Sequence, residues 1–196
     1  MEIETTLIYN RRPDTIIYIV GGMPDLTTRV KEGRGPSRYE EVIFKEDVEE
    51  AVERVAELYR RANLEVKQTG VTPVFATISP IHLRTWNLER LAQRKTTHLQ
   101  HIHEYRHMQN QHELCVQILN RHISAINEEN GMQTPRLAKH VLQKRGKNQN
   151  YRFRTDRFGK DGCHPSQKLV ERWIRELQEC MEVNRVRISA LCGPDF

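Results

Sequence analysis

Asp161 and His164 stand three residues apart in a short polar segment, Asp161-Gly162-Cys163-His164-Pro165-Ser166, close to the C-terminus. A carboxylate at this spacing can orient one nitrogen of an imidazole, which leaves the other nitrogen to take a proton from a nucleophile. The glycine and the proline favour a turn that brings the two side chains together. The segment therefore indicates a general base and its orienting carboxylate, and a surface turn leading into a helix is the alternative.

A second chemical pattern lies in the middle of the chain, where His103, Glu104 and His107 match the H-E-x-x-H motif of zinc metalloproteases. In that motif two histidines one helical turn apart bind zinc, and the glutamate activates water. The apolar periodicity of this segment predicts a helix whose histidines face solvent rather than a cleft. A third ligand is not specified, although Glu113 and Glu128 are candidates. We therefore expect no metal and no other cofactor, and keep zinc catalysis as an alternative.

Charge is unevenly distributed within a formal net charge of +5. Residues 40–57 contain eight acidic and two basic side chains, whereas residues 136–160 contain nine basic and one acidic. Aromatic residues interleave with the basic ones, as in proteins that bind single-stranded nucleic acid. The side chains that would make such contacts are Arg145, Lys147, Arg152 and Arg154. A solvated basic loop is the alternative.

Length and composition indicate one domain of 196 residues, with a core over about 13–183 and a C-terminal tail over 184–196. The four cysteines form no C-x-x-C pair, which favours a reducing compartment. The N-terminus is acidic, and no apolar run approaches the roughly 18 residues that a membrane span needs. We expect a cytoplasmic protein, with the nucleus as an alternative, and no membrane association.

The N-terminal half predicts a parallel crossover unit. Residues 14–20 form a β-branched and aromatic run that is typical of a strand buried on both faces. Residues 23–45 resemble a loop, 45–64 have the apolar spacing of an amphipathic helix, and 71–78 predict a second buried strand. Strand, helix and strand in this order form a parallel pair with a crossover.

The C-terminal half predicts further alternation. We expect a long helix over 88–122, a third strand over 122–127, a short helix near 134–144 and a last helix over 167–183, preceded by Ser166 as its cap. Together these elements predict a three-layer α/β/α sandwich with a mostly parallel sheet. Active residues gather at the carboxyl ends of the strands in such sheets. The loop after residue 20, the turn at Ser79 and the Asp161 segment would meet there.

Three segments in this order, residues 13–26, 72–80 and 161–166, also carry a resemblance to a known family. The chain resembles the SGNH (GDSL-type) hydrolases, whose pattern runs from a strand ending in G-x-N-D, through a strand ending near prolines, to D-G-x-H-P before the closing helix. The resemblance implies a flavodoxin-like sandwich and an esterase or deacylase activity on a small ester. It implies His164 as general base, Asp161 as its orienting carboxylate, and an oxyanion-side loop containing Gly22, Pro24 and Asp25.

The chain departs from that family at two points. Pro24 stands where the family has asparagine, so neither a side-chain amide nor a backbone N–H is offered to an oxyanion there. The sequence also contains no G-D-S turn, and Ser79 is only a weak candidate for the nucleophile. We therefore expect an N-terminally truncated and catalytically incomplete hydrolase domain. The alternative is a non-enzymatic, nucleic-acid-associated module that uses the basic segment 136–160, since domains that resemble this one can accompany mobile-element proteins. Loss of the first strand would leave residues 14–20 as an apolar edge, and we expect self-association through it.

Overall fold

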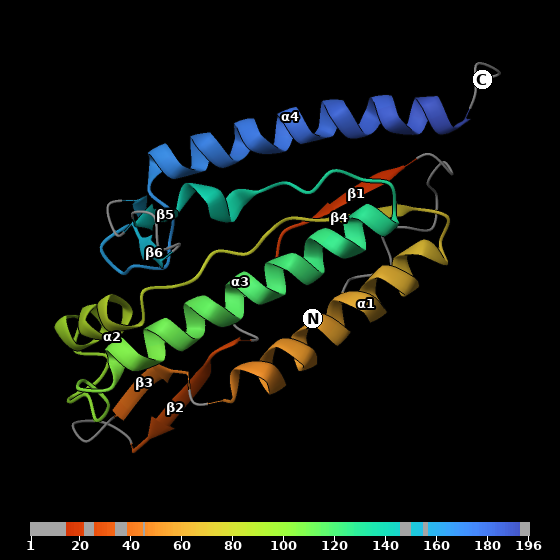
Figure 1. Cartoon of the computed structure of the whole chain (residues 1–196). Coiled ribbons are helices and arrows are strands. Elements are labelled where there is room, and N and C mark those ends of the chain that lie inside the picture. Colours follow the sequence, from red (N-terminus) through yellow and green to blue (C-terminus); the bar gives the residue numbers. More distant parts are fainter. Residues whose placement is uncertain are drawn as a thin grey trace.

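A computed structural model describes residues 15–21, 26–33, 39–44, 46–145, 150–154 and 157–192, and the side chains of all of these except 143–145, 150–153 and 190–192. The described part is a mixed α/β structure (Figure 1). Its elements in chain order are β1 (Ile16–Ile19), β2 (Thr28–Glu32), β3 (Tyr39–Ile43), α1 (Val48–Lys67), β4 (Thr72–Phe75), α2 (Leu83–Ala92), α3 (Tyr105–Glu129), the 3-10 helix η4 (Leu137–His140), β5 (Leu142–Arg145), β6 (Asn150–Phe153) and α4 (Gln167–Cys192).

The predicted parallel crossover unit is confirmed. Strands β1 and β4 pair in parallel, with a register that runs from Ile16 opposite Thr72 to Ile19 opposite Phe75. Helix α1 lies between them in sequence. Within the described residues β1 has β4 as its only strand neighbour, and Val20 just beyond it is exposed. Self-association through this edge stays a prediction.

Helices α1 and α3 lie on one side of this strand pair, and α4 lies on the other (Figure 1). On the α4 side, the Asn184 amide donates to the Tyr18 hydroxyl of β1 at 3.1 Å. On the α3 side, the Asn127 amide accepts from the Phe75 N–H at 2.9 Å and donates to the Phe75 carbonyl at 2.7 Å. Asn120 binds both backbone groups of Ile78 in the same way. Side-chain amides of α3 thus satisfy backbone groups of β4 and its extension, which would otherwise be buried and unpaired.

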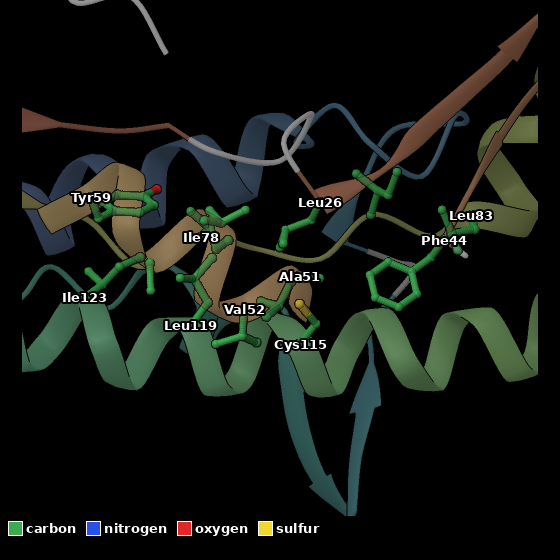
Figure 2. Packing of buried hydrophobic residues seen from close by; sticks show 14 of the residues in the cluster. Leu26, Phe44, Ala51, Val52, Tyr59, Ile78, Leu83, Cys115, Leu119 and Ile123 are labelled. Carbon is green, nitrogen blue, oxygen red and sulfur yellow. The ribbon is translucent and has the colours of Figure 1, made fainter. Parts of the chain in front are cut away.

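The main core forms where α1 packs against α3 (Figure 2). The Asp47 carboxylate caps α1 by accepting from the Glu49 N–H at 2.8 Å, and apolar residues follow at helical spacing. Side chains of both helices point toward one another together with Leu26, Phe44 and Ile78, and those visible in Figure 2 are Ala51, Val52, Tyr59, Cys115, Leu119 and Ile123. None of the described helices is long and apolar enough to cross a membrane.

The loop predicted over 23–45 is wrong for the part that the structure describes, because β2 and β3 form an antiparallel hairpin there. Strand β3 is buried on both faces even though it carries two adjacent glutamates. Glu40 pairs with Arg90 at 2.5 Å and with Arg29 at 2.6 Å. Glu41 accepts hydrogen bonds from Tyr39, Tyr105 and His101. These carboxylates can be buried because residues distant in sequence compensate their charge. A hydrophobic pattern in the sequence cannot reveal such partners.

The helix predicted over 88–122 is wrong at both ends. Helix α2 ends at Ala92, and Arg94 with φ of 55° starts a run of turns that lasts until α3 begins at Tyr105. The third strand predicted over 122–127 is also wrong, since those residues continue α3. Ile123 and Ile126 extend the buried stripe of Leu119 at helical spacing. Short β-branched runs suit either a strand or a buried helix segment.

The C-terminal third departs from expectation in its details. The helix predicted near 134–144 shrinks to η4, and the predicted basic loop contains the antiparallel hairpin of β5 and β6. The final helix α4 begins at the predicted residue and extends to Cys192, beyond the expected end at 183. Ser166 caps it, because its hydroxyl accepts from the Leu169 N–H at 3.4 Å.

His112 on α3 makes acid destabilisation an expected property of the fold. The imidazole is fully buried and packs edge-on against Phe44, and among the described residues neither of its ring nitrogens has a hydrogen-bond partner. Burial lowers the pKa of His112 to about 4, below the value of about 6.5 in an unfolded chain. The unfolded state therefore takes up a proton first as pH falls. The free energy of unfolding should decrease by up to about 3 kcal/mol as the pH falls from the unfolded to the folded pKa of His112.

Urea unfolding at about pH 7 and about pH 4.5 measures this effect. His112→Leu should remove the His112 part of the loss, whereas His107→Leu, at an exposed position of the same helix, should keep it. Equal pH dependence in the wild type and His112→Leu would contradict the assignment.

Candidate active site at the carboxyl ends of β1 and β4

Asp161 and His164 are brought together as the sequence predicts. The Asp161 Oδ2 atom bonds the Nδ1 atom of His164, while Oδ1 accepts from the backbone N–H groups of Cys163 at 3.0 Å and His164 at 2.9 Å. One carboxylate therefore both forms the turn and orients the ring. The Nε2 atom of His164 has no hydrogen-bond partner within the described part of the chain, and the side chain is 74% exposed.

Gly162 fixes the turn against the start of α2. Its φ is 68°, a conformation that favours glycine, and its carbonyl accepts from the His82 N–H at 3.0 Å. A Cβ atom at this position would lie 2.9 Å from Thr85 Cβ and 3.0 Å from His82 Cβ. Because of this close approach, the centroids of the His164 ring and of the Trp86 ring of α2 lie 6.2 Å apart. Glycine is thus required for both backbone conformation and space.

The Asp161 carboxyl is suited to remain ionised. Its partial burial would raise its pKa, but hydrogen bonds from the His164 ring and from two backbone N–H groups outweigh this effect. The pKa of Asp161 is therefore below its ordinary value. An ionised Asp161 keeps the proton of a neutral His164 on Nδ1 and leaves Nε2 as the acceptor.

A pocket of about 280 Å³ opens at the carboxyl ends of β1 and β4, beside the Asp161 turn. Its wall is mainly apolar, and it combines chain segments far apart in sequence: Val20, Gly21, Thr77, Ile78, Ser79, Leu137, Phe158, Cys163, Pro165 and Trp173. Cys163 and Pro165 line it on either side of His164 in sequence. The three segments expected to converge at this edge therefore meet here, since the end of β1, the Ser79 turn and the Asp161 turn share one pocket.

The three pocket residues with nucleophilic atoms, Thr77, Ser79 and Cys163, differ from an activated nucleophile. Ser79 is 8% exposed, and its hydroxyl has no hydrogen-bond partner in the described structure, hence no base beside it. Burial and the Asp161 charge raise the pKa of the Cys163 thiol, which disfavours the thiolate. The Thr77 hydroxyl donates to the Pro135 carbonyl at 3.3 Å, and in the described structure none of the three side chains is hydrogen-bonded by the base that nucleophilic catalysis requires.

Several predicted site residues lie outside the description. Gly22, Pro24 and Asp25 of the oxyanion-side loop are outside the described residues, as are Lys147 and the side chains of Arg145 and Arg152. Arg154 is described and half-buried, and its N–H donates to the Val141 carbonyl at 2.9 Å.

The H-E-x-x-H residues are not grouped with a third metal ligand in the described structure. Because α3 begins at Tyr105, His103 and Glu104 precede the helix that was expected to carry the motif, and His107 stands within its first turn. All three side chains are exposed. Across the described ranges no three His, Cys, Asp or Glu side chains are grouped so as to hold a metal ion.

The aromatic residues of the site were not identified from the sequence. Trp173 belongs to the apolar stripe of α4, where spacing alone predicts core packing, and its indole N–H donates to the Leu137 carbonyl at 3.1 Å. Trp86 carries no sequence signal for its place beside His164. None of the family models, curated proteins or solved structures compared with this chain matches it. The functional interpretation therefore rests on the residues and their geometry.

Proposed function

We propose that the chain is an SGNH hydrolase-like domain, a three-layer α/β/α sandwich of flavodoxin-like type, that lacks the serine nucleophile of that family but retains slow hydrolysis of small esters at the Asp161–His164 pair. The observation that carries the proposal is the position of this oriented, exposed imidazole beside an apolar pocket at the carboxyl ends of two parallel strands. The fold class fits the β1–α1–β4 crossover and the helices on both sides of it.

Water is the attacking group in this proposal. The sequence has no G-D-S turn, and in the described structure no base hydrogen-bonds the Ser79 hydroxyl or the Cys163 thiol. A water molecule at His164 Nε2 attacks the ester carbonyl carbon and gives its proton to that nitrogen. As the ester C–O bond breaks, His164 returns the proton to the leaving alcohol oxygen, and a carboxylic acid and an alcohol result. Asp161 stabilises the imidazolium that forms between the two transfers.

The pocket sets the expected substrate class. Its apolar wall and volume of about 280 Å³ suit a short, uncharged acyl group. Cys163 and Pro165, which flank the exposed His164 in sequence, line the pocket, and the proposal requires that an acyl chain in the pocket leave its carbonyl at the rim within reach of the imidazole. A turnover below that of complete serine esterases is expected, because general-base catalysis alone contributes about 10²- to 10⁴-fold.

Blocking the pocket mouth tests this function. Val20 lines the pocket and is 59% exposed, so Val20→Trp can add bulk there with little disturbance of the core. We expect the kcat/KM for p-nitrophenyl butyrate to fall by about 5- to 50-fold, because the variant loses the contribution that burial of a short acyl chain makes to transition-state binding. Leu64→Trp, at a position of α1 that is 61% exposed, is the matched control and should leave kcat/KM unchanged.

Two results would refute the proposal. The first is a wild-type protein that hydrolyses neither p-nitrophenyl acetate nor the butyrate ester faster than buffer does. The second is a Val20→Trp variant that hydrolyses the butyrate ester as fast as the wild type.

A further inference from the structure

A second cavity, distinct in composition from the ester pocket, lies between η4 and α4. Its volume is about 340 Å³, and all of its lining side chains are ionisable: Lys139, His140, Arg172, Arg175, Glu176 and Glu179. The first two come from η4. The other four are spaced i, i+3, i+4 and i+7 on α4 and so form one stripe on the helix. No residue of this cavity lines the pocket beside His164.

Glu176 is the buried anchor of this cavity. Its side chain is 8% exposed, it pairs with Lys139, and it accepts from the Arg136 N–H at 3.2 Å. These contacts outweigh burial and keep the pKa of Glu176 below its ordinary value. The Glu176 charge is therefore compensated by Lys139, and among the other permanently charged groups of the lining the two arginines outnumber the single carboxylate of Glu179.

Arg172 and Arg175 supply that excess of positive charge. Neither guanidinium forms an ion pair in the described part of the chain, and the Nε atom of Arg175 is 3.5 Å from the Glu171 carbonyl of its own helix. His140 Nε2 is buried, lies 3.4 Å from Glu176 Oε2 and lacks a well-aligned partner. Two arginines one turn apart, opposite a lysine, present forked N–H donors to a shared space, which is the arrangement that suits phosphate oxygens.

We propose that the cavity between η4 and α4 binds a phosphate group, carried either by free pyrophosphate or by the backbone of a single-stranded nucleic acid. A metal cation would meet the two guanidinium groups of Arg172 and Arg175, which form no ion pair in the described part of the chain, whereas a phosphate needs them to balance its own charge and that of Glu179. The proposal is independent of ester hydrolysis, since the two cavities share no residue.

Binding of two probes to a charge-removal variant tests the proposal. The variant is Arg172→Gln/Arg175→Gln, and its control, Arg185→Gln/Arg187→Gln, removes the same charge from two exposed positions of the same helix. Fluorescence anisotropy measures a labelled oligothymidylate of about 12 nucleotides, and titration calorimetry measures inorganic pyrophosphate. Thermal unfolding of both variants establishes that each remains folded.

We expect at least one probe to bind the wild type and the control, and to bind the Arg172/Arg175 variant at least about tenfold more weakly. If the oligonucleotide is the affected probe, the ligand is a nucleic-acid backbone, and the dependence of log K on log salt should weaken by about 1.4. If only pyrophosphate is affected, the ligand is a free phosphate. Failure of both probes to bind the wild type, or equal affinity in both variants, would overturn the proposal.

Discussion

Replacing Glu41 with alanine should lower the free energy of unfolding by about 3–5 kcal/mol, the largest stability effect that we expect of any single side chain. Glu41 is fully buried in β3, where its carboxylate accepts from the Tyr39 and Tyr105 hydroxyls and from the His101 ring at 2.9 Å. Alanine would leave these three donors without their acceptor inside the protein. Unpaired buried donors cost far more than the net stabilisation of the bonds themselves.

The charge state of Glu41 gives this prediction a pH dependence. Burial alone would raise the pKa of its carboxyl, but hydrogen bonds from Tyr105, Tyr39 and His101 outweigh burial and hold the pKa below its ordinary value. The stabilisation is therefore present above the pKa of an unfolded glutamate, about 4.3, and is lost as pH falls through the lower folded value. The difference between wild type and Glu41→Ala should shrink in that acid range.

Urea unfolding of Glu41→Ala and Glu53→Ala measures the effect against a matched control. Glu53 is an exposed glutamate of α1 that pairs with Arg60 at 2.8 Å, and because a solvated ion pair of this kind contributes little to stability, its loss should cost far less than that of Glu41. A Glu41→Ala protein as stable as Glu53→Ala would show that the buried network contributes nothing to the fold.

Removing the His164 imidazole should have the largest effect on activity. We expect His164→Ala to lower the kcat/KM for p-nitrophenyl butyrate by about 10²- to 10⁴-fold, because no other side chain hydrogen-bonds Asp161 in the described structure and the base is lost outright. Asp161→Asn should also slow hydrolysis by at least about tenfold, since an amide can hold the wrong ring tautomer. Ser79→Ala should leave kcat/KM unchanged if water is the attacking group.

The sequence was most informative where local patterns decide structure. The β-branched runs that became β1 and β4, the apolar stripe of α1 and the serine cap of α4 follow from spacing alone. The Asp161–His164 contact was also predictable, because both partners lie within one turn and Gly162 permits it.

What the sequence did not reveal depends on contacts between distant segments. Strand β3 contains adjacent glutamates that are buried only because Arg90 and Tyr105 reach them from elsewhere in the chain. The wall of the ester pocket joins Val20 to Trp173, and the charged cavity joins η4 to α4. Such sites cannot be predicted from the sequence, because no periodicity or short motif marks residues that are distant in sequence.

The hydrolysis of p-nitrophenyl butyrate by wild type, His164→Ala and His107→Ala tests the central claim most directly. His107 is an exposed histidine of α3 and controls for loss of any surface imidazole. If the Asp161–His164 pair is the active site, the wild type and His107→Ala should both hydrolyse the ester. The kcat/KM of His164→Ala should be lower by at least about 100-fold, with the fold retained. Equal rates in the His164→Ala and His107→Ala proteins would contradict it.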